Sequence, residues 1–300
     1  MGMRLGIDIG GTFTDFILAT GTGELVIKKV LSTPSAPEEA VFVGVQELAT
    51  GLGVTLGDFV AKCDHIIHGT TIATNTLLTR TGPTMGILHT DGFRDVLYLR
   101  DGFKPDRYNL QLEPPPPLIE RYLRRSVGER ILHDGSVEAP LDEASVRAAL
   151  ADFRRAGVTS VAVSLLWSMI NPAHERRIAE IIVEEMPEAY VALSCDILPR
   201  IREYPRACAT ALSAYVGPAI EEYLTRIAEY FKTNGYQRDL LVMQATGSSA
   251  RVPDIQQRPV LAIGSGPAAG PPASLFIGGR DQENDLVGRG RQHGFLEEQL

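Results

Sequence analysis

Short runs with alternating apolar residues open the chain. Residues 4–9, 13–18 and 25–30 are three such runs, and glycine-containing turns separate them. The pattern predicts three antiparallel strands. Residues 37–52 then place apolar side chains at helical spacing behind Pro37, a residue that suits the first turn of a helix. We therefore expect a helix that covers one face of a small sheet.

Strands and helices continue to alternate after this helix. Residues 65–67 are typical of a buried strand. The segment HGTTIATNTLLTRTG, which follows, is typical of a polar loop that opens a helix, and residues 84–89 are typical of another strand. Together they predict a strand–helix–strand unit, the crossover that joins parallel strands.

The pattern changes between residues 99 and 132, where four consecutive prolines stand among arginines and tyrosines. No period holds there, so we expect an extended, partly polyproline excursion on the surface. Beyond it the α/β alternation resumes. It predicts helices at 142–156, 174–186 and 205–232, and the last of these has a break or kink at Gly217-Pro218. It predicts strands at 160–165, 190–193, 239–243 and 260–262, and a final helical stretch that opens at 265–267.

Composition limits the classes of function. The 300 residues are 44% hydrophobic and 22% charged, which is typical of globular proteins. A net charge of −8 offers no cationic field for nucleic acid or an anionic membrane. The three cysteines are too few and too scattered for a disulfide framework or a metal cage. With no export signal or apolar span in the sequence, a cytoplasmic location is expected.

Residues 7–15 (IDIGGTFTD) have the composition of a phosphate-binding loop. Glycines let backbone N–H groups approach phosphate oxygens, and threonine hydroxyls add further donors. Asp8, near the end of the strand, can orient Mg²⁺ through its water shell. The alternative is a Gly-Gly hairpin with a capping aspartate. Neither a P-loop nor a dinucleotide fingerprint is present.

The same residues carry a resemblance to known families. IDIGGTFTD resembles the first phosphate motif of the actin, sugar kinase and Hsp70 superfamily. HGTTIATNTLLTRTG and DGFRDVL more narrowly resemble the hydantoinase A / 5-oxoprolinase family, to which acetone and acetophenone carboxylase subunits belong. Further segments match in order, among them ERYLRRSVGERI, SCDILPRIREYPRACATALSAYVGP and RPVLAIGSGPAAG, so the resemblance covers residues 3–270.

This resemblance implies a ribonuclease-H-like α/β fold with a mixed sheet and helices. It implies ATP and Mg²⁺ as cofactors, hydrolysis of a cyclic amide of the hydantoin or 5-oxoproline type, and a hydantoinase B-type partner subunit. An ATP-dependent ketone carboxylase subunit is the alternative within the family. Residues 1–182 would form the N-terminal region with the phosphate loop, residues 183–278 the start of a hydantoinase A domain, and residues 279–300 a divergent tail.

The resemblance also assigns roles to single residues. Asp8 would be catalytic and hold Mg²⁺ through water, and His68 would be a second catalytic group that donates to a developing oxyanion. The expected nucleotide-binding residues are Gly10, Gly11, Thr12, Thr14 and Asp15 in the first loop and Gly69, Thr70, Thr71 and Asn75 in the second. The alternative for the second loop is a helix cap with a packed imidazole.

Weaker signals have structural alternatives. His65 and His68 do not share a helical face, so a metal site there is not favoured. Arg94 and Asp95 suit an ion pair. Arg202 and Glu203 precede the long helix. They suit contacts with a substrate or a partner, and the alternative is a solvated or capping charge pair. Residues 265–270 (SGPAAG) suit close backbone approach or a second anion site.

Two rival functions and the chain length complete the expectations. One rival is a sugar- or acid-kinase-like enzyme, and the other is a truncated, non-catalytic remnant or partner-binding subunit; a homo-oligomer is left open. The tail after residue 278 replaces the second phosphate loop expected from the family. We therefore expect a fold that stops before the second nucleotide-binding lobe, with weak ATP binding and little catalysis by this chain alone.

Overall fold

The computed structural model describes residues 2–102, 108–109, 111 and 116–270, and these residues form two compact units. The first unit holds residues up to Arg80 together with residues from Ala219 onward, and the second holds Thr81–Pro218. This division into compact units does not test the expected sequence regions 1–182 and 183–278, which stay a prediction. The expected tail, 279–300, lies outside the described residues.

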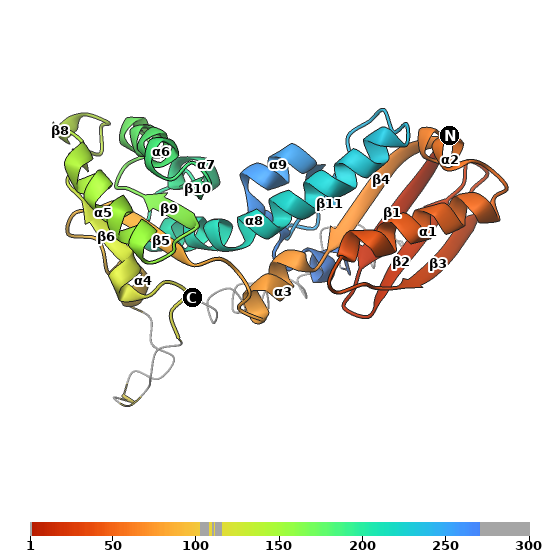
Figure 1. Cartoon of the computed structure of the whole chain (residues 1–300), viewed down its shortest axis with the longest axis horizontal. Coiled ribbons are helices and arrows are strands. Elements are labelled where there is room, and N and C mark those ends of the chain that lie inside the picture. Colours follow the sequence, from red (N-terminus) through yellow and green to blue (C-terminus); the bar gives the residue numbers. More distant parts are fainter. Residues whose placement is uncertain (1, 103–107, 110, 112–115, 271–300) are drawn as a thin grey trace, which may run out of the picture. The chain divides into compact units, whose positions relative to one another are not determined.

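The first unit is built on a mixed sheet of six strands in the order β12-β11-β4-β1-β2-β3 (Figure 1). The strands are β1 (Met3–Ile9), β2 (Phe13–Ala19), β3 (Leu25–Leu31), β4 (Cys63–Thr70), β11 (Leu241–Met243) and β12 (Ser249–Arg251). The predicted antiparallel arrangement of the first three strands is confirmed. Strand β4 runs parallel to β1 and to β11. The predicted α/β class with a mixed sheet is therefore confirmed.

The helices of this unit cover one face of the sheet or, as α3 (Ile72–Leu78) does, lie at its end. The others are α1 (Pro37–Gly51), α2 (Leu56–Ala61), α9 (Val252–Gln257) and the part of α8 (Glu203–Thr233) that belongs to this unit. Helix α1 begins at Pro37 as predicted, and it packs against β2 and β3 (Figure 1). Phe16 of β2 is fully buried beneath Gly44 of α1, where the missing side chain makes room for the ring.

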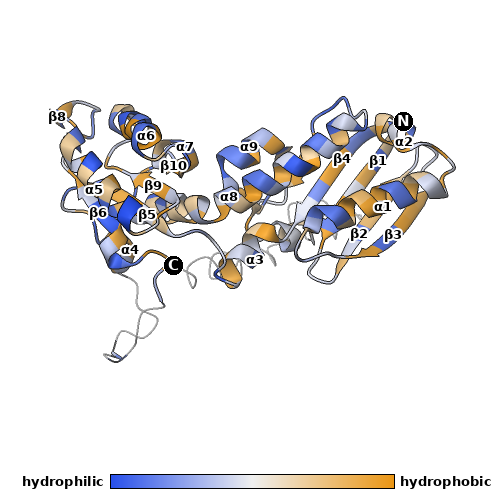
Figure 2. Cartoon of the chain, in the orientation of Figure 1, coloured by the Kyte–Doolittle hydropathy of each residue, from blue (hydrophilic) through white to orange (hydrophobic). Residues whose placement is uncertain are grey.

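The other face of β2 and β3 exposes apolar residues. Phe13, Ile17, Leu25, Ile27 and Leu31 are between 40% and 72% exposed on these two strands, and Figure 2 shows both strands largely in the orange of hydrophobic residues. Strand side chains alternate between faces, so the buried and exposed sets interleave along the same strands.

The second unit contains a parallel sheet of four strands in the order β10-β9-β5-β6. The strands are β5 (Met85–Thr90), β6 (Arg124–Val127), β9 (Ser160–Ser164) and β10 (Tyr190–Leu193), beside the small pair β7 (Arg130–Ile131) and β8 (Val137–Ala139). Its helices are α4 (Val96–Leu99), α5 (Glu143–Arg155), α6 (Ala173–Glu185), α7 (Ser194–Ile197) and the first part of α8, and a 3₁₀ turn, η1, spans Arg121–Leu123. Asp142 caps α5 with its side chain, as such residues commonly do.

Three predicted elements were wrong. Strands β4 and β5 do not form one strand–helix–strand unit, because β4 pairs with β1 and β11 while β5 pairs with β6 and β9 in the other sheet. Of the expected excursion at 99–132, residues 103–107, 110 and 112–115 lie outside the described residues. Its far end was wrong, since η1 and β6 return to the fold from residue 121. Two arginines, Arg124 and Arg125, obscured this strand, and Arg124 is 4% exposed and donates to the Ile119 carbonyl.

The third error is at residues 260–262. They lie in a 3₁₀ turn, η2 (Pro259–Ala262), because three apolar residues do not distinguish a strand from a buried turn and Pro259 lacks a ladder donor. The long helix α8 continues through Pro218 and does not break there. Within the described residues, no helix is long and apolar enough to cross a membrane.

The packing of Gly44 on Phe16 yields a test of the first unit. A methyl group at Gly44 would overlap the Phe16 ring. We expect Gly44→Ala to lower the free energy of unfolding by about 1–3 kcal/mol, as overpacking does in a dense core. Urea denaturation measures the change.

Gly51→Ala in the same helix is the matched control, because no atom lies within 4 Å of the position of its Cβ. It should be neutral or slightly stabilising, since alanine favours the helix. Equal effects of the two substitutions would contradict the packing argument.

Candidate functional site

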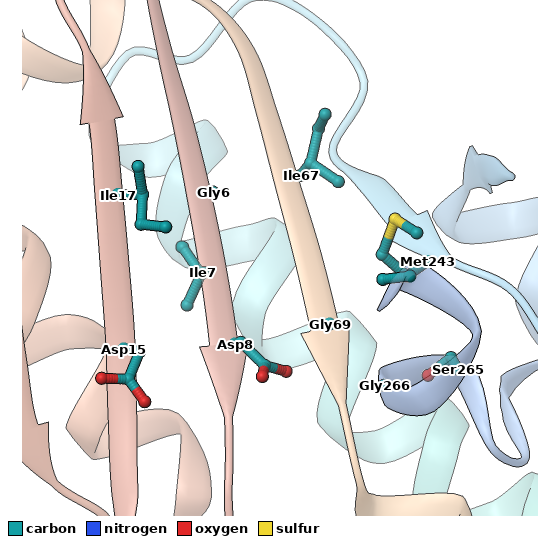
Figure 3. Close-up of a pocket in the computed structure, with 11 residues that line it drawn as sticks. Gly6, Ile7, Asp8, Asp15, Ile17, Ile67, Gly69, Met243, Ser265 and Gly266 are labelled. Atoms are coloured by element: carbon teal, nitrogen blue, oxygen red, sulfur yellow. The ribbon is translucent and has the colours of Figure 1, made fainter. Parts of the chain in front are cut away.

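A cavity of about 230 Å³ opens on the uncovered face of the first unit's sheet. Its floor is built from neighbouring strands (Figure 3). Asp8 of β1 stands directly beside Asp15 of β2 and Gly69 of β4. One step back along the same face, Gly6 stands between Ile17 and Ile67. Two rows of paired residues therefore form the floor, and β1 lies at its centre.

Glycines leave the space that the cavity occupies. A Cβ added to Gly69 would lie 2.7 Å from Oδ1 of Asp8, so any other residue there would press on the carboxylate. The far wall comes from Met243 at the end of β11 and from the helical residues 265–270. Ser265 and Gly266 line the cavity there, and Ser265 Oγ donates to the Thr70 carbonyl at 3.1 Å. The close backbone approach or second anion site expected of residues 265–270 stays a prediction, since a Cβ added to Gly266 would meet no described atom within 4 Å.

The two carboxylates differ in their surroundings. Partial burial, and to a lesser extent the neighbouring Asp15, raise the pKa of Asp8 above its ordinary value. Asp15 has a counter-ion, because Lys29 Nζ lies 2.8 Å from its Oδ1. A cation beside Asp8 would therefore relieve repulsion between the two acids. Among the described residues there is no group of three or more His, Cys, Asp or Glu side chains able to hold a metal ion.

The Gly-Gly turn joins β1 to β2 next to the cavity. Gly10 N–H donates to the Phe13 carbonyl at 2.9 Å, and the Gly10 carbonyl accepts from Ser32 Oγ at 2.8 Å. Ser32, directly after β3, thus holds the turn from one side. Gly11 and Thr12 are exposed, and a Cβ at Gly11 would meet no atom within 4 Å. Their polar groups are accessible to a ligand.

Thr14 is not brought to the cavity. It is fully buried on the helix-covered face, and its hydroxyl bonds to Ser32 Oγ at 3.0 Å. The expected contact with nucleotide therefore fails for its side chain, because Thr14 alternates with Asp15 along β2 and the two must face opposite sides.

His68 is likewise on the covered face. The structure continues β4 through Thr70, so His68 belongs to a strand and not to a loop. Its side chain is fully buried, and Nε2 lies 2.6 Å from the Tyr223 hydroxyl of α8. Burial lowers the pKa of His68 to about 4. The packed imidazole, the alternative to a catalytic role, is the arrangement observed.

The rest of the second loop anchors α3 to the end of β1. Thr71 Oγ1 donates to the Ile9 carbonyl at 3.2 Å, and Asn75 Nδ2 donates to Thr71 Oγ1 at 3.2 Å. Thr70 Oγ1 accepts from Ile72 N–H at 3.3 Å. Of the four residues expected in this loop, Gly69 lines the cavity, whereas Thr70, Thr71 and Asn75 support its edge.

Other lining residues were missed. Gly6, Ile17, Ile67 and Met243 belong to the cavity but carried no motif. Alternation identifies two of them, because Gly6 and Ile67 stand two residues before Asp8 and Gly69 on their strands and so share their face. The predicted ion pair of Arg94 and Asp95 is present at 4.0 Å, and Asp95 bonds more closely to Arg121.

Comparison with known proteins identifies the family of the chain. The family model described as the hydantoinase/oxoprolinase N-terminal region matches residues 4–186, and the hydantoinase/oxoprolinase model matches residues 206–288.

The chain belongs to the hydantoinase/oxoprolinase family.

Similar proteins of this family are larger. The chain is 42% identical to caprolactamase subunit alpha of Pseudomonas jessenii over 91% of its own length and 40% of the relative's. The crystal structure of the ATP-dependent caprolactamase from that organism is similar with a TM-score of 0.81 and 41% identity, and it matches 92% of this chain and 40% of that one.

A nucleotide-free acetone carboxylase structure has a TM-score of 0.85 and 28% identity, over 93% of this chain and 41% of that one. The chain therefore spans about two fifths of the length of these relatives.

The buried imidazole of His68 predicts a pH dependence. An unfolded chain binds a proton near pH 6.5 and the folded chain only near pH 4, so stability falls as the pH drops through this window. His68→Gln should remove up to about 3 kcal/mol of that pH-dependent loss between pH 7 and pH 4. Urea denaturation at several pH values measures it.

His65→Gln is the control, because His65 lies on the same strand and is exposed. An unchanged pH dependence in His68→Gln, or an equal change in both variants, would show that His68 is not held neutral by burial.

Proposed function

We propose that this family member binds the phosphates of ATP at the cavity of the first unit. Its role would be that of an A-type subunit in ATP-dependent hydrolysis of a cyclic amide of the hydantoin or 5-oxoproline type. The observation that carries this proposal is the row formed by Asp15, Asp8 and Gly69 beside an accessible Gly-Gly turn. It combines carboxylates for a metal–phosphate complex with backbone that an anion can approach.

The backbone supplies the phosphate contacts in this proposal. Gly11 and Thr12 present exposed polar groups at the turn, and Gly69 leaves the floor open beside Asp8. The cavity needs no excess of basic residues, because amide dipoles and one metal ion can neutralise phosphate locally. ATP would supply activation of the amide carbonyl by phosphorylation of its oxygen, and this chain's residues would position the phosphates for it.

Mg²⁺ would sit near Asp8 through water. This ion keeps several waters and takes few protein ligands beside phosphates, which suits a site with two neighbouring carboxylates and no larger ligand cluster among the described residues. Asp15, with Lys29 at 2.8 Å, contributes less negative charge than Asp8 does. Asp8 is therefore the carboxylate that we assign to the cation.

The strand order supports a ribonuclease-H-like fold for the first unit. Three antiparallel strands are followed by the parallel strands β4 and β11, in the spatial order β3-β2-β1-β4-β11. We assign the unit to the actin, sugar kinase and Hsp70 superfamily on this order together with the phosphate-type turn. The assignment is consistent with the two structural relatives.

A ketone carboxylase subunit is the second candidate, favoured by the similarity to acetone carboxylase. Both candidates begin with ATP-dependent activation of a carbonyl or enolate oxygen. Analysis of products separates them, because hydrolysis of a cyclic amide yields a ring-opened carboxylate and carboxylation yields a carboxylated ketone. A stable phosphorylated metabolite would instead favour the sugar- or acid-kinase-like rival.

A B-type partner subunit completes the proposal. The relatives that the chain matches include a protein named as a subunit, and the chain spans about 40% of its length. ATP turnover should therefore be compared for the purified chain and for the chain co-expressed with a hydantoinase B-type protein. Turnover in neither preparation would favour the non-catalytic remnant.

Asp8→Asn tests the assigned role. In an assembly that turns over ATP, this substitution should lower kcat by about 10²–10³-fold, because it removes the charge that orients the metal–phosphate complex. Steady-state ADP release at saturating MgATP measures it. Asp239→Asn, at an exposed position of the same unit, is the matched control and should leave turnover unchanged. Full turnover by Asp8→Asn would refute the role.

Gly69→Ala tests the floor of the cavity. Its methyl group would stand 2.7 Å from Oδ1 of Asp8 and displace that carboxylate. We expect the KM for MgATP to rise by about 10-fold or more, as for the loss of one good contact. Gly57→Ala is the control, since the nearest atom to its Cβ would lie at an ordinary 3.8 Å. An unchanged KM in Gly69→Ala would place the nucleotide elsewhere.

A further inference from the structure

The parallel sheet of the second unit has a topological switch point. The chain passes from β5 to β6 on one side, crosses to β9 on the other side of β5, and continues outward to β10. The connections that leave β5 and β9 therefore run in opposite directions, which opens a crevice at the carboxyl ends of these two strands. Ligands of open α/β sheets bind at this position.

A small cavity lies at that point. It is lined by the last residues of β5 and β9, among them His89, Thr90 and Ser164, and by Arg206 of α8. Its enclosed volume is about 10 Å³, room for one water-sized group. Half-buried Phe93 and Val96 also line it, so the body of a larger molecule would meet apolar side chains there.

His89 lines this cavity and carries an unused acceptor. The side chain is 2% exposed, and its Nδ1 lies 3.1 Å from the Ser164 carbonyl oxygen. A carbonyl oxygen only accepts, so Nδ1 carries the proton and donates it. Burial lowers the pKa of His89 to about 4, which keeps the ring neutral near pH 7. Nε2 is then a lone-pair acceptor, and it has no hydrogen-bond partner among the described residues.

Arg206 presents an unused donor. Its side chain is 1% exposed, and Nη2 donates to the Leu165 carbonyl at 2.8 Å and to Ser194 Oγ at 2.5 Å. The carboxylate of Glu175, 3.9 Å away, balances its charge. The Nε–H group has no hydrogen-bond partner in the part of the chain that the structure describes. A buried donor and a buried acceptor on the lining of one cavity are both unsatisfied, which is costly unless a ligand bonds to them.

We propose that the cavity at the carboxyl ends of β5 and β9 binds a small neutral molecule through a group that both donates and accepts a hydrogen bond, of the amide or alcohol class. The ligand's N–H or O–H donates to His89 Nε2, and its oxygen accepts from Arg206 Nε. A carboxylate would oppose the lone pair of His89, and an ammonium would face the charge of Arg206. The proposal concerns the second unit alone and does not depend on nucleotide binding in the first.

Backbone strain at the same place agrees with a ligand site. Trp167, directly after the lining residue Leu166, has φ of 54°, and Arg202, directly before the lining residue Glu203, has φ of 92°. Such conformations are disfavoured for residues with a side chain and gather at functional sites. Glu203, which the sequence singled out beside Arg202, thus lies at the cavity and not merely in solvent.

Four small probes test the proposal on the full chain. Acetamide and ethanol offer both a donor and an acceptor, N,N-dimethylacetamide offers an acceptor alone, and acetate is charged. The ¹⁵N resonance of His89 Nε2, assigned by its loss in His89→Gln, reports a hydrogen bond to this atom directly. Acetamide or ethanol should shift it saturably with a Kd in the range of about 1–100 mM, as fits so few atoms. The other two probes should bind at least about 10-fold more weakly.

The stronger of acetamide and ethanol identifies the class of ligand. No shift with any probe up to about 200 mM would mean that the cavity holds a water only, and this would overturn the proposal. Equal shifts with all four probes would overturn it as well, because binding would not then depend on the paired donor and acceptor.

A variant outside the polar network guards against unfolding in His89→Gln. Val96→Trp should fill the mouth and weaken acetamide or ethanol binding by about 5-fold or more while the network stays intact. Val183→Trp, at a position 63% exposed on α6, is the matched control and should bind as the parent chain does. Unchanged binding in Val96→Trp would place the probes elsewhere and overturn the proposal.

Discussion

Strand β1 is hydrogen-bonded along both edges, to β2 on one side and to β4 on the other, and this double pairing positions the cavity of the first unit. Pairing in register places Asp15, Asp8 and Gly69 in one row on the open face. The next row, Phe16, Ile7 and His68, must then face the helices, because successive residues of a strand point to opposite sides. A slip of the strand register by one residue would bury Asp8 and Asp15 and expose the core side chains. The chemistry of the site therefore requires the same register that the core requires.

The covered face makes that register costly to change. Leu5, Ile7, Phe16 and Leu18 are at most 3% exposed, and His68 joins them with its bond to Tyr223. Glycine serves both faces: Gly44 admits the Phe16 ring beneath α1, and Gly69 leaves space above the floor of the cavity. The site can therefore hold two neighbouring carboxylates, since the apolar face behind them provides the stability that the acids do not.

The second unit uses buried polar groups where the first uses apolar ones. Glu175 is fully buried and accepts from Leu165 N–H, Ser194 Oγ and Cys195 N–H at 2.6–2.9 Å. Arg206 bonds to the same loop after β9. These bonds hold the carboxyl ends of the strands in fixed positions, which is what an open α/β sheet requires to present a ligand crevice.

The sequence by itself determined the elements and the family. Periodicity placed α1, α5, α6 and β9 within a residue or two, because amphipathic patterns are local, and the Gly-Gly motif with its companions identified the hydantoinase/oxoprolinase relationship. Only the tertiary structure decided which sheet received β5, which face received His68 and Thr14, and that Arg206 and His89, more than a hundred residues apart in the chain, line one cavity. Those outcomes depend on pairing and packing between distant segments, and no local pattern contains that information.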